Sequence, residues 1–183
     1  MRVITGVARG MRLQTPEGLD VRPTAERVKE AIFSAIQFEL EGRRFLDLFA
    51  GSGQMGIEAL SRGAASAVFV DDSKVSLAAV RANLAKTKLG DRATVVSLPA
   101  QAYLARADGT FDIAFLDPPY RQHIVEGVLP MLEPLMNEGG AVICETADDE
   151  TLPGRVGALQ SERSYHYSRT AVTVYRKKSD GNG

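Results

Sequence analysis

Short apolar runs and amphipathic stretches alternate along most of this chain. Apolar runs of strand length lie at residues 45–49, 67–71, 93–98, 111–117 and 141–146. Between them, apolar residues recur at helical spacing at 56–63, 74–87, 100–106 and 122–136. Strands that alternate with helices predict right-handed crossovers and a parallel sheet. A last strand, at 170–176, follows a long connection and is expected to pair antiparallel. The pattern predicts an open, doubly wound α/β fold.

The first part of the chain has a different pattern. Residues 3–13 form two short extended runs around Gly6 and Gly10, which predicts a β-hairpin. Thr24 is a suitable N-cap for a helix whose apolar face begins at Val28 and which should end near Gly42. We therefore expect three parts, listed in chain order: an N-terminal β-hairpin appendage at 1–21, an α/β domain at 22–178 and a disordered tail at 179–183.

Composition excludes several classes of protein. The chain has 183 residues, of which 44% are apolar and 25% charged, so it can bury a hydrophobic core without disulfide bonds or a structural metal. Its single cysteine, Cys144, cannot form an internal disulfide, which favours a reducing, cytoplasmic location. One cysteine and two histidines do not suit a zinc site, and we expect no metal. No apolar run reaches the roughly 20 residues that span a bilayer, so we expect no membrane partner.

Charge is distributed unevenly although its sum is close to zero. The net charge is −1, which by itself indicates no nucleic-acid partner. Residues 1–16 nevertheless carry three arginines and no acid, and residues 163–178 carry five basic residues and no acid. These ends are compatible with a local nucleic-acid-binding surface and equally with ordinary solvated charges.

A glycine-rich loop follows the first strand of the α/β domain. Gly51, Gly53 and Gly56 match the pattern G-x-G-x-x-G at a strand-to-helix turn. Asp71 lies 20 residues beyond Gly51, at the end of the next strand, where an acid can accept hydrogen bonds from ribose hydroxyls. These features suit a dinucleotide and S-adenosylmethionine alike, because both use a helix N-terminus and a ribose acceptor.

Asp47, four residues before the first glycine, favours S-adenosylmethionine. A carboxylate at this strand end can bind the ammonium group of a methionyl moiety, whereas it is less useful beside a pyrophosphate. The form D-x-F-x-G-x-G resembles the S-adenosylmethionine loop of class I methyltransferases. The cofactor site predicted here consists of the two acids and the loop residues, namely Asp47, Ala50, Gly51, Ser52, Gly53, Gln54, Gly56 and Asp71.

A second motif follows the strand predicted at 111–117. Asp117, Pro118, Pro119 and Tyr120 form a stiff turn, because the two prolines have fixed φ angles and donate no hydrogen bond. The Asp117 carboxylate and the Pro118 carbonyl can each accept an N–H of an exocyclic amine, and Tyr120 offers a ring on which a base can stack. We predict that these four residues are the catalytic residues of an amine methylation.

Together, DLFAGSG and DPPY resemble the class I methyltransferases that modify N6 of adenine or N2 of guanine. The segments RPTAERVKEAIF (22–33), GIEALSRGA (56–64) and VITGVARGMRL (3–13) extend the resemblance to the RsmD family of bacterial 16S rRNA guanine-N2 methyltransferases, over about residues 2–176. The resemblance implies a Rossmann-like, mostly parallel seven-stranded sheet with an N-terminal β-hairpin. It also implies S-adenosylmethionine as methyl donor.

The resemblance further implies 16S rRNA or the small ribosomal subunit particle as partner, and we expect a monomer. We assign RNA binding to the basic N-terminal residues and to the RPT segment, namely Arg9, Arg12, Arg22 and Thr24. Two positions depart from the family pattern. Pro99 replaces the usual acid or amide that faces the adenine, so Ala100 and Gln101 are the predicted substitutes, and Ser168 stands where a glycine is expected.

Alternatives remain open at this point. The DPPY chemistry permits N6-adenine methylation of DNA or RNA, and methylation of a protein glutamine is feasible. GSGQMG with Asp71 also fits a nucleotide-dependent oxidoreductase, which would bind NAD in place of S-adenosylmethionine. A non-enzymatic rRNA-binding module would need the basic ends but neither the glycine loop nor DPPY.

Overall fold

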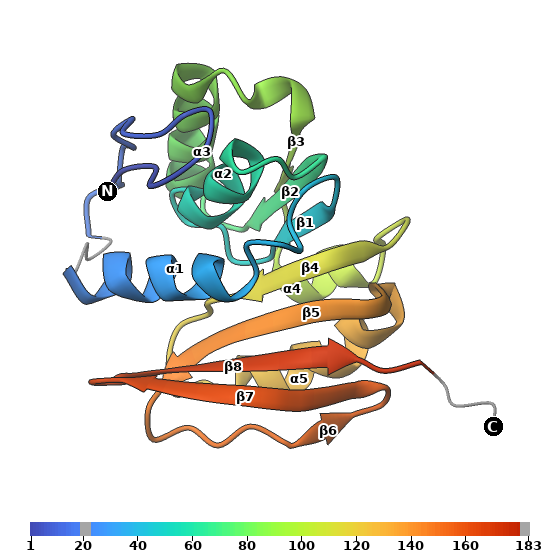
Figure 1. Ribbon diagram of the computed structural model, residues 1–183. Helices are drawn as coiled ribbons and strands as arrows, with labels where there is room; N and C mark the ends of the chain where they lie inside the picture. The colour runs from blue at the N-terminus through green and yellow to red at the C-terminus, as the bar shows by residue number, and fades with distance from the viewer. Residues whose placement is uncertain (19–22, 180–183) are drawn as a thin grey trace.

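A single mixed sheet organises the protein, which is described here from a computed structural model covering residues 1–18 and 23–179 (Figure 1). The eight strands are β1 (Arg44–Asp47), β2 (Ser66–Asp71), β3 (Ala93–Ser97), β4 (Phe111–Leu116), β5 (Met136–Ala147), β6 (Arg155–Val156), β7 (Leu159–Tyr167) and β8 (Thr170–Lys177). The helices are α1 (Pro23–Ala35), α2 (Gln54–Ser61), α3 (Lys74–Thr87), α4 (Ala100–Leu104) and α5 (Ile124–Leu132), with short 3-10 turns η1 (Gly90–Arg92) and η2 (Glu133–Leu135).

The order of the strands determines where the sheet opens a crevice. The order across the sheet is β3-β2-β1-β4-β5-β8-β7-β6. Strands β1 to β5 are parallel, whereas β8 pairs antiparallel with β5 and β7 pairs antiparallel with β8. The chain runs outward from β1 to β3 and then returns to β4 on the other side of β1. Such a reversal opens a crevice at the carboxyl ends of the strands, where open α/β sheets bind ligands.

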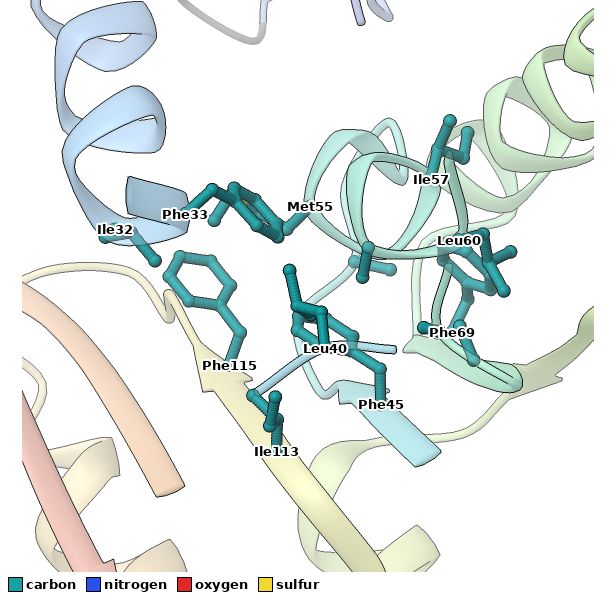
Figure 2. Packing of buried hydrophobic residues seen from close by; sticks show 14 of the residues in the cluster. Ile32, Phe33, Leu40, Phe45, Met55, Ile57, Leu60, Phe69, Ile113 and Phe115 are labelled. Carbon is teal, nitrogen blue, oxygen red and sulfur yellow. The ribbon is translucent and has the colours of Figure 1, made fainter. Parts of the chain in front are cut away.

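Helices cover both faces of the sheet. Alternate strand residues point to opposite faces, so that Phe45 and Phe115 pack with α1, α2 and α3 while Leu46 and Leu116 pack with α4 and α5. Figure 2 shows Ile32 and Phe33 of α1 close to Phe115 of β4 and Met55 of α2. We call the cluster that contains Phe45 and Phe115 the first core. It holds α1 beside the carboxyl end of β4 and so places this helix at the edge of the crevice.

Side-chain hydrogen bonds hold the N-terminal segment against α2 and α3. Glu58 of α2 accepts the backbone N–H groups of Ile4 and Thr5 at 2.9 and 3.0 Å. Asn83 of α3, which is fully buried, accepts the N–H of Gln14 at 2.7 Å and donates to the Gln14 carbonyl at 2.9 Å. Val3, Ala8 and Leu13 are buried in the first core, so the segment adds to it.

The structure corrects several predictions in this region. Helix α1 begins at Pro23, a favoured first helical residue, so Thr24 lies inside the helix and not at its N-cap. The helix ends at Ala35, about seven residues before Gly42, because Leu40 turns into the core and Glu39 reaches Arg176 of β8 at 2.6 Å. The expected N-terminal hairpin is reduced to one isolated bridge between Arg2 and Arg12.

The remaining elements mostly agree with the prediction. The predicted helix at 74–87 is confirmed, and the five parallel strands and the last strand overlap the apolar runs that predicted them. The helix predicted at 122–136 ends earlier, at Leu132, and the strand predicted at 141–146 begins earlier, at Met136. Within the described residues the sheet has eight strands where seven were expected, because the two-residue β6 is added at its edge. The long connection predicted before the last strand instead contains β7, in which the polar residues 160–164 precede the alternating Tyr165 and Tyr167. Residues 180–183 of the expected tail lie outside the described residues. No helix in the described ranges is long and apolar enough to cross a membrane.

Candidate active site

A cleft of about 950 Å³ lies at the carboxyl ends of the parallel strands, which is a usual size for a small-molecule site. It brings together most of the residues predicted from the two motifs. The predicted residues that line it are Asp47, Ala50, Gly51, Ser52, Gln54, Asp71, Ala100, Gln101, Asp117, Pro118, Pro119 and Tyr120. The glycine loop and the DPPY turn, 60 residues apart in the chain, therefore face one space.

Asp71 holds the glycine loop in position. One of its carboxylate oxygens accepts the N–H of Gly51 at 2.9 Å, and the other accepts the N–H of Ser73 at 2.9 Å. Gly51 has a φ of +55°, a left-handed conformation that glycine adopts without strain. Asn83 also holds the loop, because its side-chain amide donates a hydrogen bond to the Ser52 carbonyl at 2.9 Å. Hydrogen bonds within the protein thus hold the loop in its shape.

Gly53 and Gly56 do not line the cleft. A Cβ atom at Gly56 would lie 2.3 Å from the ring of Phe69, so this glycine allows α2 to approach β2 closely. Gly53 has a φ of +79° and lies against Val80 of α3. Gly53 therefore serves the tight turn and Gly56 the close contact between helix and strand. The prediction had included both among the cofactor-binding residues.

Asp47 is a buried carboxylate at the floor of the cleft. Only 1% of the residue is exposed, and its Oδ2 accepts the N–H of Gly56 at 3.0 Å. Burial raises the pKa of Asp47 to about 8, and the nearby charge of Asp71 adds to this effect. A cationic group placed beside Asp47 would compensate the cost of ionising it.

The DPPY turn is braced by the neighbouring strands. The Tyr120 hydroxyl lies 3.1 Å from Glu145 Oε1 of β5 and 3.1 Å from Thr170 Oγ1 of β8. Burial raises the pKa of the Tyr120 phenol, which is therefore neutral at physiological pH. Leu116, the last residue of β4, pairs with Cys144 of β5, so Asp117 follows β4 beside Glu145, which lies inside β5, two residues before its end. Both of these acids line the cleft.

Comparison with known proteins places the chain in a family. The sequence profile of the family described as "Conserved hypothetical protein 95" matches residues 1–176. The "Putative rRNA methyltransferase YlbH" of Bacillus subtilis (strain 168) is 38% identical over 97% of this chain and 100% of the relative. The "Ribosomal RNA small subunit methyltransferase D" of Escherichia coli (strain K12) is 33% identical over 99% and 92%, respectively. The chain belongs to this family.

Solved structures agree with this assignment. The "Putative methyltransferase yhhF from Escherichia coli" superposes with a TM-score of 0.87 and 31% identity over 98% of this chain and 99% of that protein. The resemblance to the RsmD family is confirmed, and with it the class I methyltransferase fold. Methyl transfer from S-adenosylmethionine is the activity of this family, and the NAD-dependent alternative is set aside.

The two departures from the family pattern have local structural explanations. Pro99 precedes α4, and the first residues of that helix, Ala100 and Gln101, line the cleft where the missing acid would lie. Ser168 has a φ of +55° in the two-residue turn between β7 and β8. A glycine would adopt this conformation without strain, which explains why glycine is expected there.

Two of the predicted RNA-binding residues, Arg9 and Arg12, do not line the cleft. Arg9 and Arg12 are exposed on the N-terminal segment, and Arg12 borders a shallow depression shared with Arg2. The prediction for Arg22 falls outside the described residues. Of Thr24 only the backbone, in the first turn of α1, is described. In residues 1–18 and 23–179, no group of three or more side chains is arranged to hold a metal ion.

The cleft also contains residues that the motifs did not indicate. Glu145 comes from β5, Arg169 from the turn before β8, Thr170 from the start of β8 and Lys29 from α1. An acid near the end of a buried strand is a signal that would have found Glu145. Lys29 gives no such signal, because its position depends on an ion pair with Glu58, at 3.1 Å, that joins α1 to α2.

Asp47→Asn is expected to stabilise the cofactor-free protein at alkaline pH. Because the fold raises the pKa of Asp47 from 3.8 to about 8, the carboxyl group contributes stability at low pH that is lost as pH rises through 8. Asparagine is not charged and can still accept the Gly56 N–H. Urea unfolding of both proteins should therefore show the largest gain at pH 9 and little gain near pH 4. An equal gain at both pH values would contradict the buried-charge explanation.

Proposed function

We propose that this protein transfers a methyl group from S-adenosylmethionine to the exocyclic N2 of a guanine in 16S rRNA. The main support is that Asp117, just after β4, and Glu145, near the end of the neighbouring β5, line the same cleft as the glycine loop. The names of the relatives support an rRNA substrate and, in the Escherichia coli relative, the small subunit. The free rRNA and the small-subunit particle are both candidate forms of the substrate.

The donor side of the cleft suits S-adenosylmethionine. Gln54 Oε1 is buried, lines the cleft and has no hydrogen-bond partner among the described residues, so an acceptor is left for a ligand. Together with Asp47 it would hold the methionyl ammonium group. Asp71 would accept a ribose hydroxyl, and Ala100 and Gln101 would face the adenine. When bound, S-adenosylmethionine supplies an electrophilic methyl group on a positively charged sulfur.

The acceptor side of the cleft suits guanine better than adenine. Guanine presents two adjacent donors, the N2 amine and N1–H, whereas adenine presents its N6 amine beside the lone pair of N1. Asp117 and the Pro118 carbonyl would accept the two N–H bonds of the N2 amine. Glu145, on the next strand, would accept N1–H but would repel the N1 lone pair of adenine. This pairing of acids favours N2 of guanine over N6 of adenine.

Positioning accounts for most of the proposed rate enhancement. Asp117 and Pro118 would orient the amine so that its nitrogen lone pair points to the methyl group, and the braced ring of Tyr120 would stack on the base. As the N–C bond forms, the nitrogen loses a proton, which Asp117 or water takes. The target guanine must leave its stack to enter the cleft.

Nucleoside mass spectrometry tests the proposal. The 16S rRNA of a strain that lacks this gene should lose one N2-methylguanosine, which returns when the wild-type gene is supplied and not when an Asp117→Ala variant is supplied. Purified protein, incubated with labelled S-adenosylmethionine and either free rRNA or small subunits from that strain, should label the same nucleoside. Loss of N6-methyladenosine instead would support the adenine alternative, and no change in rRNA would refute the proposal.

The exposed arginines of the N-terminal segment are expected to contribute phosphate contacts. Replacing Arg9 and Arg12 with glutamate should weaken RNA binding and reduce the salt slope of the affinity by roughly 0.7 to 0.9 for each lost contact. Arg155→Glu, in β6 at the far edge of the sheet, provides a matched control that should leave the slope unchanged. Binding assays at several salt concentrations measure both effects. Equal slopes in all three proteins would show that RNA binds elsewhere.

A further inference from the structure

The sheet surface continues from the acceptor side of the cleft toward β7. Residues that pair across antiparallel strands point to the same face of a sheet. Glu145 of β5 pairs with Val172 of β8, which pairs with Tyr165 of β7. In the next row, Thr170 pairs with Tyr167, and its hydroxyl contacts that of Tyr120. The two tyrosines thus lie on the same face as the acceptor acids, two strands from Glu145 and about 10 Å away at the usual strand spacing.

Tyr165 and Tyr167 form an aromatic pair on this face. Their ring centroids are 6.5 Å apart and their planes are tilted by 33°. Both residues are half-buried: they pack against the edge of the first core and expose part of their rings. Tyr167 also lines the cleft. In Figure 1, α1 lies next to the end of β4, and β8 and β7 lie on the other side of β5 from β4. Tyr167 therefore borders the cleft directly, whereas Tyr165 lies farther along the strand, on the other side of the buried Val172 from Glu145.

Positive charge borders the pair at both ends. Arg163 precedes it on β7, and its guanidinium lies 3.5 Å from the Tyr165 hydroxyl. Arg169 follows it in the turn to β8 and lines the cleft. Within the described ranges, neither arginine has an acid within 4 Å of its side-chain nitrogens. Aromatic rings between cations are the combination that binds single-stranded nucleic acid, by stacking on bases and attracting phosphates.

We propose that Tyr165 and Tyr167, with Arg163 and Arg169, bind the nucleotides that flank the target base. This inference rests on the RNA substrate proposed above and adds a second binding surface to it. Once the target guanine is unstacked and in the cleft, its neighbours also lose a stacking partner. The tyrosine pair offers them a replacement on the same sheet face, next to Thr170 and Tyr120. Because every base has a π face, this surface would be tolerant of flanking sequence and would favour single-stranded RNA.

Leucine and phenylalanine substitutions separate stacking from packing. Tyr165→Leu and Tyr167→Leu keep apolar contact with the core but remove the aromatic face, whereas Tyr165→Phe and Tyr167→Phe keep it. His166→Leu is a matched control, because the intervening residue of the strand points to the opposite face. The probe is a short single-stranded RNA with one guanine among uridines and with 2-aminopurine on either side of that guanine. The fluorescence of 2-aminopurine reports its stacking.

Each leucine variant is expected to bind the probe roughly 5- to 150-fold more weakly than wild type. Its KM for 16S rRNA should rise by a similar factor, and the change in 2-aminopurine fluorescence should be lost. The phenylalanine variants and His166→Leu should differ from wild type by less than about twofold. The affinity for S-adenosylmethionine and the thermal midpoint, measured on every variant, identify any that fail to fold.

The outcomes distinguish this inference from the proposed function. If wild type methylates rRNA and the leucine variants bind and react as it does, the tyrosine surface is refuted while the proposed function stands. If the phenylalanine variants lose as much affinity as the leucine variants, the hydroxyl groups and not the rings are responsible, which also refutes stacking. If wild type neither binds nor methylates rRNA, the proposed function itself fails.

Discussion

Asp117→Ala is expected to lower kcat by a factor of roughly 10² to 10⁴ while the affinity for S-adenosylmethionine stays nearly unchanged. Asp117 follows β4 at the acceptor side of the cleft, where it would orient the amine and receive its proton. In the proposed function, S-adenosylmethionine would be held by other residues of the cleft, mainly Asp47, Gln54 and Asp71. Single-turnover kinetics would measure the chemical step, and calorimetry would measure cofactor binding.

Two further variants serve as controls for this result. Asp117→Asn keeps one oxygen acceptor and should retain more activity than the alanine variant. Tyr120→Phe removes the hydroxyl contacts with Glu145 and Thr170 but keeps the ring, so we expect a mild loss. A kcat of the alanine variant equal to that of wild type would exclude the role assigned to Asp117.

Glu58→Ala is expected to lower the free energy of unfolding by about 3–5 kcal/mol. Glu58 is fully buried and lies 3.1 Å from Lys29 Nζ and 2.9 Å from Arg62 Nε. Burial lowers the pKa of Lys29, and Glu58 opposes this shift. Removing Glu58 would leave a buried ammonium group without its counter-ion and would free two N–H groups of the N-terminal segment. Urea unfolding measures the loss.

Comparison variants show whether the buried pair causes the loss. Glu30→Ala, at the exposed position beside Lys29 on α1, should change stability by less than about 0.5 kcal/mol. Adding Lys29→Met to Glu58→Ala should recover part of the loss, because no unpaired charge is then buried. Additive effects of the two substitutions would contradict the explanation.

The sequence allowed the parallel half of the sheet and both cleft motifs to be predicted. Helix α3 was predicted at its observed bounds because its apolar residues recur at helical spacing. The structure adds an N-cap, since Ser73 Oγ accepts the Ser76 N–H at 3.2 Å. Asp47, Asp71 and Asp117 were placed at strand ends, and topology then brings such ends to one edge. These features depend on local signals, which a single sequence contains.

Features that depend on distant contacts could not be predicted in this way. Strand β7 is rich in serine and charged residues, and it exists because it pairs with β8 along its whole length. Helix α1 ends early because of contacts made by residues 39 and 40 with the rest of the protein. Lys29 enters the cleft through a buried ion pair with a residue 29 positions away. None of these partners is visible from the neighbouring sequence.

The anchoring of the N-terminal segment has a practical consequence for handling the protein. The Met1 carbonyl accepts the Leu13 N–H at 2.8 Å, the Arg2 carbonyl accepts the Lys29 ammonium at 2.9 Å, and Met1 lines the cleft. Residues fused ahead of Met1, such as an affinity tag, would therefore emerge at the mouth of the cleft and compete with RNA for space. The described part of the other terminus follows β8, which ends at Lys177 on the opposite edge of the sheet from the strand ends that form the cleft. A purification tag or a surface-immobilisation linker therefore belongs at the carboxyl terminus.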